Sequence, residues 1–262
     1  MDLQLGGKTA LVSGSTAGIG YAIAEALARE GARVIVNGRT QKAVDQAVAQ
    51  LKAAGGKVEG FAGDLSTAAG AEQLAKKFPD VDILVNNLGI FEPKAFEDIP
   101  DADWNRFFEI NVLSGVRLSR LYLAGMKKRN WGRIVFISSE SGVQIPAEMI
   151  HYGMTKTAQL AVSRGLAESL AGTGVTVNCV LPGPTRSRGV VDFVDALAKE
   201  DGKSFEAFER EFFEKVRPTS LIKRFATPEE VASMVAYVCS PLASATTGAA
   251  LRVDGGVLKS AF

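Results

Sequence analysis

Tyr152 and Lys156 lie four residues apart, at the start of a pattern typical of a long helix. Residues at this spacing share one face of a helix, so the phenol and the ammonium can meet. A neighbouring ammonium favours the phenolate and lowers the pKa of a tyrosine from about 10. Such a tyrosine can exchange a proton with a substrate oxygen while a hydride moves at the adjacent carbon. This spacing also occurs on exposed helices. The surrounding sequence must therefore show whether this pair is catalytic.

Further polar side chains follow the ends of candidate strands. Ser139 lies thirteen residues before Tyr152, where the apolar run at 133–139 ends. The run before it ends in the sequence NNLG, and Asn111 lies in the helical stretch that follows. Sheets of parallel strands bind ligands outside the carboxyl ends of their strands. We therefore predict one catalytic site that contains Asn111, Ser139, Tyr152 and Lys156.

A glycine-rich turn follows the first candidate strand and precedes a helical pattern. Small residues at such a turn let backbone N–H groups approach a pyrophosphate, which the start of the helix also attracts. The spacing here is G-x-x-x-G-x-G, whereas many dinucleotide folds have G-x-G-x-x-G, and tight turns also need glycine. The predicted cofactor contacts in this turn are Gly14, Ser15, Thr16, Gly18, Ile19 and Gly20.

The end of the second candidate strand bears on the choice of cofactor. An acid at this point commonly binds the adenosine ribose in dinucleotide folds. Here the sequence is Asn37-Gly38-Arg39-Thr40, without a carboxylate. Arg39 can form a charge-assisted contact with a 2′-phosphate, which favours NADP(H) over NAD(H). The alternative is that Arg39 is simply solvated, as most arginines are.

Short apolar runs alternate with longer helical patterns along the chain. The candidate strands lie at 9–13, 33–37, 57–62, 82–87, 133–139, 175–181 and 250–253. Several are continuous apolar runs, which suits parallel strands buried on both faces. Between the first two, Ile23 and Leu27 repeat at a helical spacing. The alternation predicts a single α/β domain over residues 1–262, with a doubly wound parallel sheet.

One long segment, at about 184–225, contains no strand candidate and is rich in charge and phenylalanine. Within it Phe205, Phe208, Phe212 and Val216 fall on one apolar helical face. A long insertion late in this type of fold is often a lid over the active site. A helix packed on the body of the protein, or on a subunit partner, explains the pattern equally well.

The composition argues against several classes of function. Among 262 residues, 30 Lys and Arg balance 29 Asp and Glu to a net charge of +1, which gives no general attraction for nucleic acid or an anionic membrane. One histidine and two distant cysteines, Cys179 and Cys239, argue against a metal site or a disulfide framework. No apolar run approaches the ~20 residues of a membrane helix, and a strand begins too early for a signal peptide. We expect a soluble, cytoplasmic protein.

Taken together, the motifs resemble those of the short-chain dehydrogenase/reductase family. The resemblance runs from Thr9 to Gly256. It rests on SGSTAGIG (13–20), Asp64-Leu65, NNLG (86–89), Asn111, Ser139, YGMTK (152–156), Leu181-Pro182-Gly183 and Val253-Asp254-Gly255-Gly256. It implies a Rossmann fold and an oxidoreductase with a nicotinamide cofactor. Two departures, Ser13 for the usual Thr and Leu88 for the frequent Ala, do not concern the proton chemistry.

The resemblance implies a role for each matching catalytic residue. Tyr152 donates or accepts the proton, and Ser139 orients the substrate carbonyl. Lys156 binds the nicotinamide ribose and depresses the pKa of Tyr152, and Asn111 holds a water in the proton relay.

It also implies the remaining cofactor contacts. Asp64, with Leu65 beside it, faces the adenine, and the backbone at Asn87 and Gly89 lines the adenosine side. The segment after Pro182 and Gly183 meets the nicotinamide carboxamide through Thr185 or Ser187.

Two neighbours of the catalytic residues are discounted. His151 adjoins Tyr152, but successive helix residues point about 100° apart, so we expect it to pack or to line the pocket. Ser138 adjoins Ser139 on a strand and should face the opposite side of the sheet.

We therefore predict an NADP(H)-dependent oxidoreductase that interconverts a ketone or aldehyde and an alcohol. The resemblance favours reduction, because cellular NADP pools are commonly kept reduced. Alternatives within the family are a 3-oxoacyl-carrier-protein reductase, which the long 184–225 insertion disfavours, and an NAD-dependent alcohol dehydrogenase. The complete catalytic set argues against a non-catalytic, cofactor-binding regulator, and the missing acid at Gly38 argues against a methyltransferase.

The substrate is expected to be a small molecule, apolar or ring-bearing if the lid is lined with phenylalanine. The predicted pocket wall is Ile90, Phe91, Gln144, Glu148 and Met149, together with the lid face. The resemblance further implies a homotetramer, with the Tyr152 helix and the C-terminal segment at its interfaces.

Overall fold

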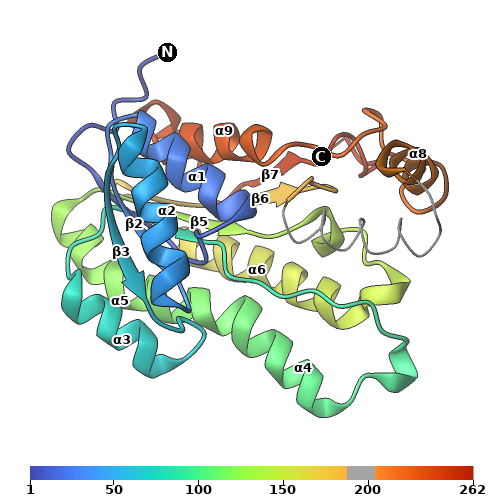
Figure 1. The fold of residues 1–262 in the computed structure, drawn as a ribbon. Coiled ribbons are helices and arrows are strands. Elements are labelled where there is room, and N and C mark those ends of the chain that lie inside the picture. The colour runs from blue at the N-terminus through green and yellow to red at the C-terminus, as the bar shows by residue number, and fades with distance from the viewer. Residues whose placement is uncertain (188–203, 262) are drawn as a thin grey trace.

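The computed structural model describes residues 1–187 and 204–261, which surround a seven-stranded parallel sheet (Figure 1). The strands are β1 (Thr9–Val12), β2 (Arg33–Gly38), β3 (Lys57–Ala62), β4 (Ile83–Asn86), β5 (Gly132–Ile137), β6 (Val175–Pro182) and β7 (Ala250–Val253). Their order is β3-β2-β1-β4-β5-β6-β7. The seven predicted strands and the doubly wound sheet are confirmed, with strand ends that differ by at most two residues.

The central strands are buried on both faces, as their continuous apolar sequences predict. All six residues of β5 and all eight of β6 are buried. Along β5, Val135 and Ile137 belong to the core on one face, whereas Ile134 and Phe136 belong to the core on the other. The free thiols of the two cysteines lie in these same cores, where burial raises each pKa to about 12.

Helices cover both faces of the sheet (Figure 1). On one face lie α1 (Gly18–Arg29), α2 (Gln41–Ala53) and α9 (Pro228–Cys239), and on the other α3 (Ala68–Lys77), α5 (Ser114–Arg129) and α6 (Ile150–Glu168). Ile23 and Leu27 of α1 are fully buried, as their spacing predicts. In the part of the chain that the structure describes, no helix is both long and apolar enough to cross a membrane.

The strand order reverses between β1 and β4, which are neighbours in the sheet although two βα units separate them in sequence. The chain leaves β1 toward one face, and the connection after β4 lies on the other. A crevice opens beyond the carboxyl ends of two such strands. The glycine turn after β1 and the NNLG sequence after β4 both lie at this point.

An irregular helical stretch leads from this crevice to the second face of the sheet. Helix α4 (Asp101–Phe108) continues into a π-helical turn, η2 (Glu109–Leu113), before α5 begins. Single π turns inside longer helices often occur at functional sites. Within residues 1–187 and 204–261 there are also four short 3₁₀ helices, at η1 (Phe96–Asp98), η3 (Glu140–Gly142), η4 (Ala147–Met149) and η5 (Pro241–Ala243).

The segment predicted as a lid is described only in part, because residues 188–203 lie outside the described ranges. Its helix α8 (Phe205–Lys215) lies at the right of Figure 1, outside the helices that flank the sheet. Phe205, Phe208 and Phe212 pack with Phe225 and with the buried Phe213.

Val216 directly follows α8, and its N–H still donates to Phe212 O, but it is 47% exposed and lies outside this cluster. The phenylalanines of the predicted apolar face therefore pack together, whereas Val216 does not join them. The rings of α8 pack against one another, which agrees with a packing role for this helix.

Candidate active site

The glycine turn between β1 and α1 has the backbone geometry of a phosphate cradle. Gly14 (φ +61°) and Gly18 (φ +58°) adopt the left-handed conformation that favours glycine. A Cβ atom at Gly20 would lie 2.4 Å from both Gly14 O and Asn87 Nδ2. Among the described residues no side chain caps α1 at Ala17, so the N–H groups of its first turn are available to an anion. The turn therefore fits the pyrophosphate of a dinucleotide.

Buried polar side chains attach this turn to the sheet. Ser15 Oγ donates to Val12 O (2.6 Å) and accepts from Asn37 N (3.0 Å). Asn37 Oδ1 accepts from Gly14 N (3.1 Å), and Asn87 Nδ2 donates to Gly14 O (3.0 Å). Ser15 is fully buried, so its side chain braces the turn.

Arg39 lies beyond the end of β2, where the sequence predicts recognition of a 2′-phosphate. It is exposed, and it has no hydrogen-bond or ion-pair partner among the residues that the structure describes. It precedes Thr40, the residue that caps the start of α2. A Cβ atom at Gly38 would lie 2.5 Å from Thr16 Cγ2, so the glycine turn abuts the end of β2. Thr16 and Arg39 therefore lie at the same edge of the crevice.

Asp64 and Leu65, at the end of β3, differ in what they offer a cofactor. Asp64 is exposed, and its Oδ1 accepts from Ser66 N (2.9 Å) and Ser66 Oγ (2.7 Å). Leu65 is buried in the core between the sheet and α3. Only the main chain of Leu65 is therefore open to an adenine.

Tyr152 and Ser139 come from the start of α6 and the end of β5. Ser139 is buried and Tyr152 is half-buried. Burial raises the pKa of Tyr152 well above its usual range, and the interaction with Ser139 opposes this only in part. Lys156 Nζ lies 5.5 Å from the centre of the Tyr152 ring and makes no hydrogen bond to the phenol. We predicted that Lys156 lowers the pKa of Tyr152. In the protein without a cofactor, these residues instead leave that pKa raised.

Lys156 is a buried ammonium on α6. Its Nζ donates to Ile137 O (2.9 Å) and to Gln159 Oε1 (3.4 Å), and burial lowers its pKa to about 8. A Cβ atom at Gly89 would lie 3.4 Å from Nζ, so the absence of a side chain there leaves an approach to the ammonium. A third N–H group of Lys156 remains for a ribose hydroxyl.

Asn111 lies in the π turn η2 and is held entirely by protein groups. Its Oδ1 accepts from Ile90 N (2.8 Å), and its Nδ2 donates to Ile90 O and Thr155 Oγ1, both at 3.0 Å. Its main-chain oxygen accepts from Gln159 Nε2 (2.6 Å). The buried amide of Gln159 thus joins Lys156 to the π turn that contains Asn111.

The segment after β6 turns at a tightly packed glycine. A Cβ atom at Gly183 would lie 2.6 Å from Asp254 O, and Pro182 before it is buried. Thr185 is also buried, and its Oγ1 donates back to Gly183 O (2.9 Å). Ser187 is half-buried. The hydroxyls of Thr185 and Ser187 are the two that are predicted to reach a carboxamide. That of Thr185 already donates to the main-chain oxygen of Gly183.

The two discounted neighbours are both buried. His151 is fully buried, with its ring centre 4.0 Å from that of Phe107 and 6.0 Å from that of Trp104. Ser138 Oγ donates to Lys156 O (2.8 Å), which attaches α6 to β5.

One residue of the predicted pocket wall contacts the ring of the catalytic tyrosine. Phe91 is exposed and meets the Tyr152 ring edge-on, with 6.3 Å between the ring centres. Gln144 and Glu148 are exposed, and Ile90 and Met149 are half-buried.

Sequence reasoning missed Glu140 and Gln159, which hydrogen-bond to catalytic residues, and Arg217, which pairs with Glu140. Glu140 follows Ser139 and is buried, and Arg217 forms an ion pair with it. The signals were an acid directly after a buried strand and an amide three residues after Lys156, on its helix face. Nothing comparable marks Arg217, 77 residues from its partner.

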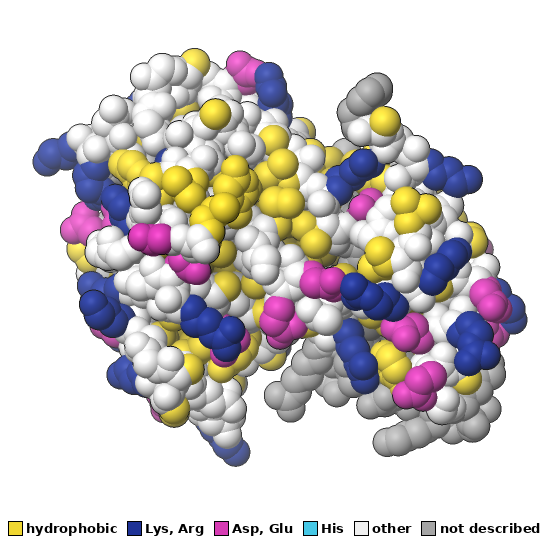
Figure 2. Space-filling model, turned by 90° about the horizontal axis from the view of Figure 1, so that it is seen from above, with side chains coloured by type: hydrophobic (Ala, Val, Ile, Leu, Met, Phe, Trp, Pro, Cys, Tyr) yellow, Lys and Arg dark blue, Asp and Glu magenta, His cyan; other side chains and the backbone are white. Residues whose placement is uncertain are grey.

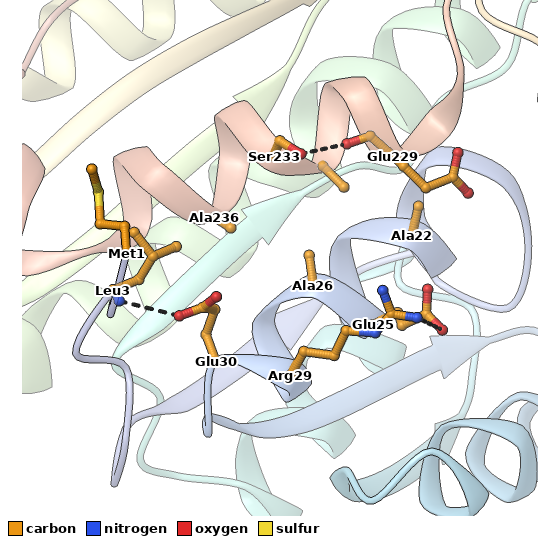
Figure 3. Close-up of a pocket in the computed structure, with 11 residues that line it drawn as sticks. Met1, Leu3, Ala22, Glu25, Ala26, Arg29, Glu30, Glu229, Ser233 and Ala236 are labelled. Atoms are coloured by element: carbon orange, nitrogen blue, oxygen red, sulfur yellow. Dashed lines mark hydrogen bonds and ion pairs between the residues drawn. The ribbon is translucent and has the colours of Figure 1, made fainter.

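A separate hollow of about 300 Å³ lies between α1 and α9 (Figure 3). Ala22, Ala26 and Ala236 line it, and Glu25, Arg29 and Glu30 stand around it. Arg29 pairs with Glu25 (3.0 Å) and Glu30 accepts from Leu3 N (3.1 Å), so these charged groups have partners within the protein. None of the predicted catalytic residues lines this hollow.

Comparison with known proteins decides the family. The family model described as Enoyl-(Acyl carrier protein) reductase matches residues 14–258. The chain belongs to the short-chain dehydrogenase/reductase family. It is 50% identical, over the full length of both chains, to the Bacillus subtilis protein called Uncharacterized oxidoreductase YvaG. It is 38% identical to the D-beta-hydroxybutyrate dehydrogenase of Cupriavidus necator, over 97% of this chain and 98% of that protein.

The fold is shared with solved members of this family. The crystal structure of L-sorbose reductase from Gluconobacter frateurii, complexed with NADPH and L-sorbose, has a TM-score of 0.93 at 33% identity. The match covers 99% of this chain and all of that one. The protein is thus an oxidoreductase of the short-chain dehydrogenase/reductase family, with the parallel sheet of that family.

Proposed function

We propose that this protein is an NADP(H)-dependent oxidoreductase that interconverts a ketone or aldehyde with an alcohol. One observation carries the proposal. Tyr152, Ser139 and Lys156 lie at the carboxyl edge of the sheet on which the glycine turn forms a cradle for a pyrophosphate. That arrangement places a proton-carrying phenol and a dinucleotide in one crevice.

Tyr152 and Lys156 have separate roles in the proposed reaction. A bound nicotinamide would supply or take up the hydride. Tyr152, whose raised pKa keeps it protonated, holds the proton that a substrate oxygen receives on reduction. Lys156 holds the ribose through its free N–H group, and Gln159 and Ile137 fix the position of its ammonium. Ser139 and Lys156 are buried, and Tyr152 is half-buried.

The preference for NADP(H) is supported by Arg39. Its guanidinium is exposed and without a partner in the described structure, next to the glycine turn, and no carboxylate at 37–40 repels a phosphate. The similar L-sorbose reductase was solved with NADPH. The remaining predicted contacts are Asp64, the main chain at Leu65, Asn87 and Gly89, and, after β6, Pro182, Gly183 and Thr185 or Ser187.

We further propose a soluble, cytoplasmic homotetramer that acts on a small-molecule carbonyl or alcohol. Figure 2 shows hydrophobic side chains across the middle of one face, with charged side chains around them. Large apolar residues exposed in the single chain include Leu221, Tyr237 and Leu242. Apolar area of this kind favours association between subunits, and the mass of the protein in solution tests it.

The Tyr152→Phe variant tests the catalytic assignment. Loss of the hydroxyl removes the proton donor, so NADPH-dependent reduction of small ketones should fall by about 10³-fold or more. NADPH binding, followed by fluorescence, should stay within about twofold, because the cradle is untouched. Tyr237→Phe, at an exposed tyrosine of α9, is the matched control and should keep full activity. Retained turnover in Tyr152→Phe would refute the assignment.

A further inference from the structure

Gln159 lies three residues after Lys156 on α6, and its amide contacts two groups of the catalytic set at once. Its Nε2 donates to Asn111 O at 2.6 Å, and its Oε1 accepts from Lys156 Nζ at 3.4 Å. Only 1% of Gln159 is exposed, so these protein groups, and not bulk water, satisfy the two ends of the amide.

The chemistry of the two partners fixes which end of the amide faces which. A main-chain carbonyl only accepts, so the NH₂ group of Gln159 must face Asn111 O, and an ammonium only donates, so the amide oxygen must face Lys156. The exchanged orientation would place two acceptors 2.6 Å apart at Asn111. Gln159 therefore has a single orientation. The Asn111 carbonyl keeps a second lone pair for the water that the family resemblance implies.

The buried charge of Lys156 has few other partners. Within the described residues its Nζ has one further acceptor, Ile137 O at 2.9 Å, and no carboxylate pairs with it. The titratable groups that face it are Cys179 of β6 and Tyr152 of its own helix, and burial raises the pKa of both, so both are neutral at pH 7. Burial lowers the pKa of Lys156 to about 8, and the amide oxygen of Gln159 opposes that loss of charge.

The two acceptors also fix the direction of the remaining donor. An ammonium has three N–H groups, and Ile137 O and Gln159 Oε1 accept from two of those on Lys156. A Cβ atom at Gly89 would lie 3.4 Å from Nζ, and the glycine has no side chain to fill that space. The third N–H group is therefore the one that is available to a ligand.

We propose that Gln159 is a positioning residue that anchors the Lys156 ammonium to the Asn111 carbonyl and so directs the third N–H group toward the ribose of the nicotinamide cofactor. Without this amide, the ammonium would keep one protein acceptor and would be free to rotate about its Cε–Nζ bond. The inference rests on the proposed function and adds a residue that acts on the cofactor through Lys156.

The first test measures the titration of Lys156 in the protein without a cofactor. In protein labelled with carbon-13 lysine, the Cε signal of Lys156 should titrate near the pKa of about 8 that burial gives it, and should be absent in Lys156→Met. Gln159→Met keeps the size of the side chain and removes the acceptor, so the midpoint should fall by about one pH unit. Gln159→Glu places a carboxylate beside the ammonium and should raise the midpoint by about one pH unit or more. Gln50→Met, at an exposed position of α2, is the matched control and should leave it unchanged.

The second test is a double-mutant cycle on NADPH binding, followed by fluorescence at about pH 6.5, below the pKa of Lys156. Gln159→Met should raise the Kd for NADPH by about threefold to tenfold. In the Lys156→Met background the same substitution should change Kd by less than about twofold, because Gln159 then has no ammonium to direct. A merely structural role of Gln159 would weaken binding equally in both backgrounds.

Three outcomes would overturn the proposal. The first is a Lys156 midpoint that neither Gln159 variant changes, and the second is a shift in the same direction in both. The third is an equal loss of NADPH affinity from Gln159→Met in the two backgrounds of the cycle. If Gln159→Met does not fold, an unchanged or lowered midpoint in Gln159→Glu is sufficient to overturn it. Absence of NADPH binding by the wild type would instead contradict the proposed function, and this inference with it.

Discussion

His151 is a fully buried imidazole, and in the described part of the chain neither of its ring nitrogens has a hydrogen-bond partner. Burial lowers its pKa from 6.5, and the nearby Lys94 and Arg106 act in the same direction. Asp103 and Glu92 oppose the shift without reversing it. His151 is therefore neutral in the folded protein at a pH where the unfolded chain already binds a proton.

This difference predicts a loss of stability on mild acidification. The contribution of His151 is complete above pH 6.5 and is lost as the pH falls through its lowered folded value. Between about pH 7.5 and pH 5.5 the wild type should lose about 1 kcal/mol because of this residue. His151→Leu, which cannot titrate, should lose correspondingly less. Urea unfolding at both pH values measures this, and an identical loss in the two proteins would contradict it.

At the scale of elements, Gln159 links α6 to the π turn before α5. Its Nε2 donates to Asn111 O at 2.6 Å, and its Oε1 accepts from Lys156. Gln159→Leu would leave the buried Asn111 carbonyl without this donor, at a cost of about 1–3 kcal/mol in the free energy of unfolding. Chemical unfolding measures the loss. Gln50→Leu, at an exposed position of α2, is the control and should change stability by less than about 0.5 kcal/mol. Equal effects would show that the link is unimportant.

The elements were predictable from the sequence where local pattern decides them. Apolar runs buried on both faces mark β5 and β6, and the spacing of Tyr152 and Lys156 places both in α6. The π turn has no local signature, and periodicity does not predict that Val216, directly after α8, is exposed. Such details depend on tertiary packing, which overrides local preference.

The candidate site shows the same division between local and distant information. Tyr152, Ser139 and Lys156 are recognisable by type and by their place after strands. The contacts that set their protonation and orientation join residues far apart in the chain, such as Gln159 with Asn111 and Arg217 with Glu140. The Ser15 side chain faces Val12 and Asn37 because of the strand pairing of β1 and β2, which the spacing of the glycines does not specify.

At the scale of the whole molecule, the residues around the expected crevice come from most of the chain. The glycine turn comes from the N-terminal strand, Lys156 from α6 and Gly183 from the end of β6, packed against Asp254 near the C-terminus. A ligand in this crevice would therefore contact both halves of the sheet. Binding to the folded state alone stabilises the entire fold by mass action.

This linkage predicts a large thermal shift that also tests the choice of cofactor. NADPH at 100 times its Kd should add about 2.7 kcal/mol, which for a chain of this size raises Tm by about 5–10 °C. Arg39→Asp should lose most of that shift with NADPH and gain one with NADH, because a carboxylate repels a 2′-phosphate and accepts from ribose hydroxyls. Tyr152→Phe is the control and should keep the full NADPH shift, since the phenol is needed for proton transfer and not for the phosphate contacts. An NADPH shift of the same size in Arg39→Asp and the wild type would show that Arg39 is merely solvated, and the cofactor preference would then need another source.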